Sequence, residues 1–361
     1  GVMMQAFYWD VPAGGTWWNT VNTKVADWSN AGIDAIWLPP VSKAQNGPFS
    51  MGYDPFDYYD FGEYNQMGSV ETRFGSRVEL TTLINTAHNN GLSVIADIVI
   101  NHNSGGASES NVYTGGNTWT NYSPLSGNFY RSANDFHANN VHANDSGVFG
   151  GFPDLCHDQA YVQDWLWKNS NSVAKYYRDV IGFDGWRFDY VKGLDPWVVK
   201  AWMDEFGGFE VGDYWDSNVS TLDWWTGAAE VSAFDFACYY KMRDAFMGNN
   251  LSVLNDNMLW KQNASRAMTF VTNHDTDEII NNKILAYAQA GLYILATDTF
   301  GQRDFLNALH YEAGQIILSN VATVVTDFDT SLLTFENKMQ RWEEATSFPW
   351  EKQSEILTKL M

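Results

Sequence analysis

Short apolar segments alternate with amphipathic stretches along most of the chain. Several segments are apolar nearly throughout, as expected of parallel strands that are buried on both faces. Seven segments predict strands: "VMMQAFYW", "IDAIWLPP", "LSVIADIVI", "FDGWRFDY", "FEVGDYW", "SAFDF" and "AMTFVTNHD".

Helical spacing of apolar residues is found between these segments, and glycines that act as stop signals follow three of the stretches. The residues that carry this pattern are Trp18, Val21, Val25 and Trp28, then Leu80, Leu83, Ile84 and Ala87, then the segment 160–182, with Gly32, Gly91 and Gly182 at the ends. Alternating strand and helix units predict a parallel sheet. Seven units, with "GLYILATD" as a candidate eighth strand, favour an α/β fold of the (β/α)8 TIM barrel type over an open sheet.

Residues 103–152 interrupt the alternation. They are rich in Gly, Asn and Ser and contain no convincing helix, so we interpret them as a loop-rich insertion after the third strand. We therefore predict a barrel of residues 1–102 and 155–300, an inserted domain of residues 103–154, and a C-terminal region of residues 301–361. In that last region "GQIILSNVATVVTDF" favours strand and "ENKMQRWEEA" favours helix.

Composition narrows the possible partners. The 361 residues include 43 acidic and 21 basic ones, a formal net charge of −22, which argues against nucleic acid and anionic membranes. No apolar run is long enough to span a bilayer, and because no signal peptide precedes the first strand we expect a trimmed or mature chain. Two cysteines do not make a disulfide framework. The 17 Trp residues suit a large core and also stacking on flat, neutral faces such as sugar rings.

Charged side chains and histidines gather where the predicted strands end. In a barrel these positions lie on one face, where reactive residues are found. The set is Asp97, His102, Arg187, Asp189, Asp213, His274 and Asp275. Each one alone has an ordinary alternative, such as a helix cap, a simple ion pair or a core histidine. Together, paired carboxylates around a neutral ring-shaped substrate are typical of glycoside hydrolysis.

Four stretches in this order, "DIVINH", "GWRFDYVKG", "VGDYWD" and "FVTNHDTD", resemble the signature stretches of the alpha-amylase family of glycoside hydrolases. "MQAFYWD" and "GYDPFDYYDFGEYNQMGSVETRFGS" extend the resemblance, which covers roughly residues 1–287. The likeness is greatest to secreted, calcium-dependent members of the archaeal and plant-like type. The chain departs from the family near its end, where a Gly-x-Pro segment and a C-terminal β-sandwich are not recognised.

The resemblance implies a role for each matching residue. Asp189 would be the nucleophile, Asp213 would stand at the position of the general acid, and Asp275 would be the third acid that grips sugar hydroxyls. Arg187 would keep the nucleophile ionised and oriented, and Asp97 would orient that arginine. The residues implied to contact substrate are Tyr53, His102, Arg187, Lys192, Trp215 and His274.

Asp213 is a departure from the family, which carries Glu at this position. Aspartate is one methylene shorter, about 1.5 Å of reach, and a misplacement near 1 Å costs on the order of 100-fold in rate. Glu210 is an unsuitable substitute, because its odd offset from Asp213 directs it to the other face of an extended strand. We therefore expect strongly reduced hydrolysis.

The insertion offers two sets of metal ligands. Hard oxygen ligands suit Ca²⁺, and by resemblance Asn101, Asp145, Gly147, Asp154 and Gly193 form a calcium site, although an ordinary Asx-rich loop is the alternative. Two histidines and a cysteine, His137, His142 and Cys156, could hold Zn²⁺. Their spacing alone is a weak signal, and the resemblance strengthens it.

Four functions remain open from the sequence. The leading one is retaining endo-hydrolysis of α-1,4-glucans such as starch by a monomer, and transglycosylation would use the same intermediate. The others are a glucan-binding homologue without turnover and a zinc hydrolase that uses the His–His–Cys set. Secretion is implied by the family resemblance alone.

Overall fold

The computed structural model describes residues 1–143, 148–247, 250–276, 294–297 and 315–318. The chain divides by packing into two units. The first comprises Gly1–Tyr240 with Asn257–Phe270, and the second comprises Lys241–Asp256 with Val271–Met361. The insertion belongs to the first unit, and the boundaries predicted for the three domains stay a prediction.

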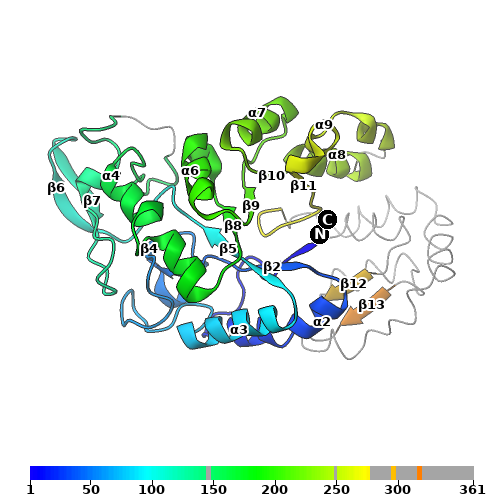
Figure 1. The fold of residues 1–361 in the computed structure, drawn as a ribbon, viewed down its shortest axis with the longest axis horizontal. Helices are drawn as coiled ribbons and strands as arrows, with labels where there is room; N and C mark the ends of the chain where they lie inside the picture. Colours follow the sequence, from blue (N-terminus) through cyan, green and yellow to red (C-terminus); the bar gives the residue numbers. More distant parts are fainter. Residues whose placement is uncertain (144–147, 248–249, 277–293, 298–314, 319–361) are drawn as a thin grey trace, which may run out of the picture. The chain divides into compact units, whose positions relative to one another are not determined.

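A seven-stranded parallel sheet forms the centre of the first unit, and its strands neighbour one another in chain order (Figure 1). All seven predicted segments contribute a strand. They are β1 Met3–Gln5, β2 Ala35–Trp37, β5 Ser93–Ile98, β8 Gly185–Phe188, β9 Phe209–Gly212, β10 Ala233–Phe234 and β11 Ala267–Met268. The short strands β3 Lys43–Ala44 and β4 Pro55–Asp57 form a separate antiparallel pair.

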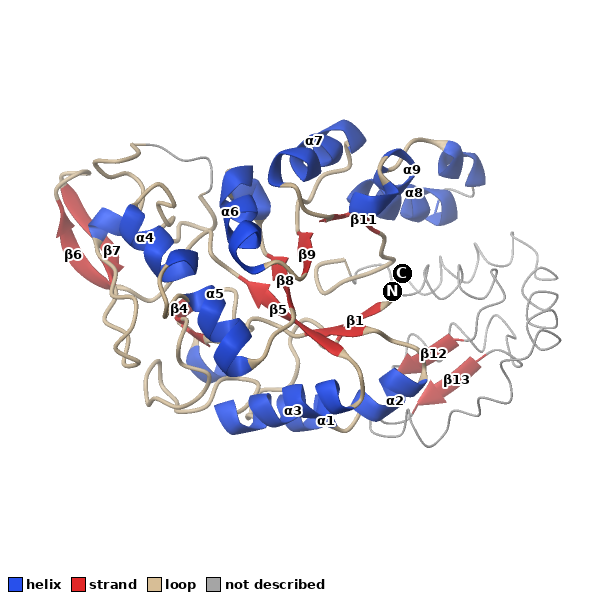
Figure 2. Ribbon diagram, viewed as in Figure 1, coloured by secondary structure: helices blue, strands red, loops and turns tan. Residues whose placement is uncertain are grey.

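Helices lie along the outside of the curled sheet (Figure 2). Their bounds are α1 Trp17–Asn22, α2 Val25–Asn30, α3 Arg77–Asn89, α4 Ala160–Gln163, α5 Val173–Lys175, α6 Pro196–Phe206, α7 Val219–Ala229, α8 Phe236–Met247 and α9 Leu259–Gln262. The helix α3 confirms the helix predicted from the spacing of its apolar residues. A capping box of Ser76 and Glu79 starts the helix, its predicted apolar face is buried, and Gly91 follows it at φ +77°.

Two predicted helices are divided. The first is interrupted between α1 and α2. The segment 160–182 forms two helices, α4 and α5, each continued by a π-helical turn, and the polar run 169–172 separates them. Ser172 accepts a hydrogen bond from the backbone N–H of Lys175, so this polar run caps a new helix instead of continuing the old one.

The insertion contains an antiparallel hairpin that the sequence pattern did not predict, β6 Ala107–Asn111 with β7 Gly116–Asn121. Its strands are polar, so they lack the apolar alternation that identifies a half-buried strand. Ser126 fastens the insertion to the barrel, because its N–H and its hydroxyl donate to Asp57 at 3.1 and 2.7 Å.

Tryptophan fills much of the core, as the composition predicted. Trp18, Trp37, Trp186, Trp202 and Trp225 are fully buried. Within the described ranges, we find no helix with the length and apolarity that a membrane crossing requires.

The candidate eighth strand is a strand, β12 Ile294–Thr297, and it pairs in parallel with β13 Gln315–Leu318. The strand β13 confirms part of the predicted strand in the tail. The helix predicted at 336–345 lies outside the described residues.

Candidate functional site

The register of three neighbouring strands brings the predicted acids together. Asp97 pairs with Arg187 across β5 and β8, and Arg187 pairs with Val211 across β8 and β9. Side chains two residues apart on a strand face the same way. Asp189 follows Arg187 by two residues and Asp213 follows Val211 by two residues, so the acids lie just beyond the ends of β8 and β9. Their backbone N–H groups continue the ladder, with bonds of 2.9 Å to the preceding strand.

Arg187 connects all three carboxylates. Its Nη1 donates to Asp97 Oδ1 at 2.8 Å and to Asp189 Oδ1 at 2.7 Å, and its Nη2 donates to Asp213 Oδ2 at 2.7 Å. The guanidinium is fully buried. Burial alone would lower the pKa of Arg187, but the three carboxylates hold it well above its usual value. The arginine is therefore a permanent cation that orients the acids.

Asp97 anchors the inner side of this arrangement. Its Oδ2 accepts hydrogen bonds from the Tyr53 hydroxyl at 2.9 Å and from the Trp37 indole at 3.0 Å, and its side chain is fully buried. Burial raises the pKa of Asp97 to about 7 against the opposing effect of Arg187. These contacts place Asp97 where it orients the arginine, as predicted.

Asp213 is bound to the arginine through one of its two oxygens. Its Oδ2 accepts from Arg187, whereas its buried Oδ1 has no hydrogen-bond partner among the described residues. Burial raises the pKa of Asp213 to about 6, and Arg187 reduces but does not cancel this effect. A proton on Oδ1 is therefore compatible with the contact that Oδ2 makes.

Glu210 lies on the other side of β9, as its odd offset predicted. Its carboxylate pairs with Arg266 at 3.8 Å. Burial raises the pKa of Glu210, and Arg266 opposes that shift. Glu210 is thus engaged elsewhere and does not replace Asp213.

The residues predicted to contact substrate fall into two groups. Tyr53 stacks on Trp9 with ring centroids 5.9 Å apart, and Trp215 stacks on Phe236 at 5.0 Å. Lys192 pairs with Asp216 at 3.0 Å. These three side chains are partly exposed and can reach a ligand.

His102 is different, because it is fully buried. Its Nε2 donates to the carbonyl of Tyr53 at 2.9 Å, and the rings of Phe149 and Phe152 stack on it at 4.8 and 5.3 Å. This burial was not predicted from the sequence. A hydrogen bond from His102 to a sugar stays a prediction that this arrangement does not favour.

His274 and Asp275 belong to the second unit. Within it they lie close together, with His274 Nε2 3.3 Å from Asp275 Oδ2. Their predicted roles beside the other acids stay predictions.

Part of the predicted calcium site is described. The backbone carbonyl of Asn101 accepts from the N–H of Leu155, next to Asp154, and a Cβ at Gly193 would lie 2.1 Å from Asn101 Oδ1. Asn101 and Gly193 therefore lie together where the insertion returns to the barrel, with Asp154 beside them in the chain, and oxygen donors of these types suit a hard cation. The Asp154 carboxylate itself contacts His137 Nδ1 at 3.2 Å. The other two predicted ligands, Asp145 and Gly147, lie outside the described residues.

Two of the three predicted zinc ligands meet directly, since His142 Nδ1 lies 3.3 Å from His137 Nε2. The third, Cys156, is buried, and its thiol contacts Asn139 Oδ1, which also accepts from the backbone N–H of His142 at 2.9 Å. In the part of the chain that is described, no group of three or more His, Cys, Asp or Glu side chains is arranged to hold a metal ion.

Trp37 is a site residue that sequence reasoning missed. Its indole donates to Asp97, and its ring lies 5.0 Å from the guanidinium carbon of Arg187. It ends strand β2, so its place at a strand end could have identified it, but the apolar run around it suggested a core residue only.

Comparison with known proteins gives one family and several relatives. Residues 17–201, just over half of the chain, match the family described as "Alpha amylase, catalytic domain". The chain is 27% identical to the glucan 1,4-alpha-maltohexaosidase of Bacillus sp. (strain 707), with 76% of this chain and 63% of that protein covered. It is 26% identical to the cytoplasmic alpha-amylase of Escherichia coli (strain K12), with 77% and 67% covered. The chain thus spans about two thirds or less of these relatives.

Solved structures agree on the fold. The alpha-amylase from Geobacillus thermoleovorans, complexed with acarbose, superimposes with a TM-score of 0.55 at 19% identity, covering 81% of this chain and 67% of that one. An alpha-amylase from Malbranchea cinnamomea gives a TM-score of 0.54 at 20% identity, covering 77% and 59%. The predicted (β/α)8 barrel fold is confirmed.

Proposed function

Because the chain belongs to the alpha-amylase family, we propose that it hydrolyses α-1,4-glucosidic bonds of starch-like glucans with retention of configuration. The observation that carries this proposal is the contact of three strand-end carboxylates, Asp97, Asp189 and Asp213, with the single guanidinium of Arg187. Two carboxylates in distinct environments are what a retaining glycosidase needs.

The two reacting acids have different roles. Asp189, held by Arg187 at 2.7 Å, attacks the anomeric carbon and forms a covalent glycosyl ester. Asp213, whose pKa is raised by burial, donates its proton to the departing glycosidic oxygen. The resulting Asp213 carboxylate then accepts a proton from the water that hydrolyses the ester. Asp275 is proposed as the third acid, which binds sugar hydroxyls.

The same geometry supports slow turnover. Asp213 is a methylene shorter than glutamate, and its Oδ2 is held on Arg187 Nη2 at 2.7 Å. Both effects draw the acid back from a glycosidic oxygen, and about 1 Å of misplacement costs roughly 100-fold.

A glucan-binding homologue without turnover is the second candidate, and the contact between Asp213 and Arg187 is the observation that favours it. Such a protein would bind sugar rings on the stacked Tyr53 and the half-exposed Trp215. Its Asp213 would remain paired with Arg187 and would not protonate the glycosidic oxygen.

Metal ions enter the proposal as structural groups. Asn101, Asp154 and Gly193 would contribute to a calcium site in which the cation neutralises oxygen donors and fixes the insertion to the barrel. His137, His142 and Cys156 would hold zinc near Asn139, and we place no step of the reaction on it.

Reducing-sugar release from soluble starch, with calcium present, tests the proposal on three proteins. We expect slow release by the unaltered chain, none by Asp189→Asn, and a rate about 100-fold higher for Asp213→Glu. A gain for Asp213→Glu identifies this position as the general acid. Absence of turnover in both the unaltered chain and Asp213→Glu would reject hydrolysis and favour the binding function. Turnover that survives Asp189→Asn would reject the assignment of the nucleophile.

A further inference from the structure

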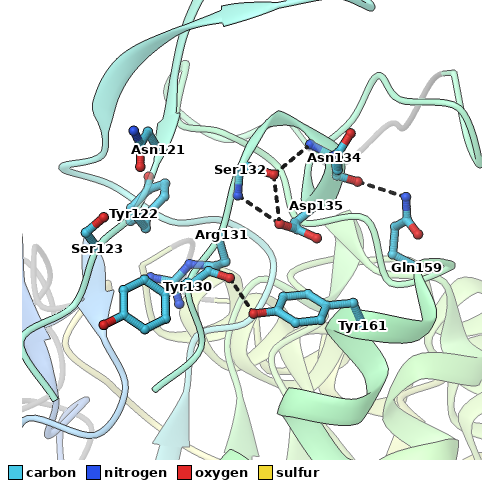
Figure 3. Close-up of a pocket in the computed structure, with 10 residues that line it drawn as sticks. All are labelled: Asn121, Tyr122, Ser123, Tyr130, Arg131, Ser132, Asn134, Asp135, Gln159 and Tyr161. Carbon is cyan, nitrogen blue, oxygen red and sulfur yellow. Dashed lines mark hydrogen bonds between the residues drawn. The ribbon is translucent and has the colours of Figure 1, made fainter. Parts of the chain in front are cut away.

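A hollow lies on the insertion, on residues that the proposed reaction does not use (Figure 3). Its volume is about 550 Å³, within the range of small-ligand sites, about 300–1,000 Å³. Asn121 lines it from the end of β7, and Ser123 follows that strand. Tyr161 lines it from the start of α4, and residues of the segment 130–135 complete the lining. It shares no lining residue with the acids at the ends of β8 and β9.

Arg131 is a buried cation in the lining of this hollow. Only 3% of it is exposed. Its guanidinium lies 4.6 Å from the ring centres of both Tyr122 and Phe129, and its Nη2 donates to the carbonyl of Phe56. Its Nε and Nη1 have no hydrogen-bond partner among the described residues. Both nitrogens are enclosed, so Arg131 contributes a positive charge to the lining but no exposed donor.

Two tyrosine rings form the open side of the hollow. Tyr130 is 51% exposed and Tyr161 is 41% exposed. The Tyr161 hydroxyl donates to the backbone carbonyl of Tyr130 at 2.7 Å, which fixes the two residues relative to each other (Figure 3). Tyr130, Tyr161, Ser123 and Asn121 all line the hollow, so rings and polar groups lie in the same lining.

The charges favour a neutral ligand. Asp135 is buried in the same lining, and its carboxylate accepts from the N–H of Ser132 at 2.8 Å. Its formal charge cancels that of Arg131, and the chain as a whole carries −22, which disfavours an anion. Aromatic faces beside hydroxyl and amide groups match a sugar, whose C–H faces stack on rings and whose hydroxyls both donate and accept.

We propose that this hollow binds a short segment of neutral glucan and so holds the polymer at a second place on the protein, apart from the acids. The choice of glucan as the sugar rests on the proposed function, whereas the hollow and its chemistry do not.

Native electrophoresis in gels with and without amylopectin tests the inference. Every chain carries Asp189→Asn so that the polymer is not consumed. We expect Tyr130→Ala to raise the apparent dissociation constant for amylopectin at least about threefold, because one stacking face is lost. Asn121→Ala should weaken retardation in the same direction. Trp119→Ala is the matched control, because Trp119 is an exposed aromatic residue of β7 that does not line the hollow, and it should leave retardation unchanged.

Equal retardation of Tyr130→Ala and Trp119→Ala would overturn the inference, as would no retardation of the parent. Starch hydrolysis by the chain with Asp189 restored tests the proposed function separately. Hydrolysis without an effect of Tyr130→Ala would reject the second site alone. A selective effect of Tyr130→Ala in a chain that does not hydrolyse starch would support the site and reject the hydrolysis.

Discussion

Replacing Asp213 with asparagine should make this protein more stable at neutral pH, although the residue is proposed to be catalytic. The change removes the charge and keeps the shape. The amide oxygen of the new side chain can still accept from Arg187 Nη2, which now lies 2.7 Å from Asp213 Oδ2. What disappears is a carboxylate whose side chain is only 8% exposed.

The size of the effect follows from the pKa of this carboxyl. Burial raises the pKa of Asp213 from 3.8 to about 6, even though Arg187 opposes the shift. Each pKa unit corresponds to about 1.4 kcal/mol between the two protonation states. A shift of about two units therefore means that ionised Asp213 weakens the folded state by roughly 3 kcal/mol relative to protonated Asp213.

The sign of this effect fixes its pH window. A folded-state pKa above the unfolded value gives stability that is complete below the unfolded pKa and is lost as the pH rises through the folded pKa. For Asp213 the loss runs from about pH 4 to about pH 6. Asparagine does not ionise, so the variant does not lose stability from this residue as the pH rises. The variant should therefore match the parent near pH 4 and exceed it by roughly 3 kcal/mol near pH 7.5.

Urea unfolding followed by tryptophan fluorescence, at both pH values, measures this difference. Asp216→Asn is the matched control. Burial acts to raise the pKa of Asp216, but hydrogen bonds from Asn218 and Lys192 outweigh it and lower the pKa. The stability that ionised Asp216 contributes is already largely present above its ordinary pKa of 3.8, so Asp216→Asn should be less stable than the parent by a similar amount at both pH values. If Asp213→Asn changes stability equally at both pH values, or lowers it near pH 7.5, then burial does not dominate at this residue and the argument is wrong.

Two further changes test how the barrel holds the site. Lys43 is fully buried, its ammonium contacts four backbone carbonyls, and Asp60 lies 3.6 Å away. Lys43→Met leaves these groups without their partner and should lower the free energy of unfolding by about 3–5 kcal/mol. An effect below about 1 kcal/mol would contradict this. Gly212 precedes Asp213, and a Cβ there would lie 2.1 Å from the Trp225 ring, so Gly212→Ala should lower the thermal midpoint. Gly227→Ala is the control: a Cβ at Gly227 in α7 would meet nothing within 4 Å, so this change should raise stability by up to about 1 kcal/mol.

The acid cluster was predictable because its geometry follows from periodicity. Strand ends were recognisable from apolar runs, and side chains two residues apart on a strand face the same way. Arg187 and Asp189 satisfy this rule on β8, Asp213 satisfies it on β9, and Glu210 fails it, as its pairing with Arg266 confirms. Local rules were therefore sufficient for the residues that carry the chemistry.

Features that depend on distant segments were not predictable in this way. The burial of His102 depends on Phe149 and Phe152, which come from the insertion some fifty residues later in the chain. The strands β6 and β7 consist mostly of polar residues and show no apolar alternation. Their formation depends on pairing within the insertion, which a single-strand pattern does not report.

Asp213 shows how stability and chemistry are coupled at one carboxyl. Burial costs stability by disfavouring the charge, and for the same reason it keeps a proton on the side chain closer to neutral pH. A proton donor is therefore present, and what the short side chain lacks is reach. Removing the charge with Asp213→Asn measures the first property, and lengthening the side chain with Asp213→Glu measures the second. If both results hold, the cluster around Arg187 has the right proton in a position that is too far from the bond to be cleaved.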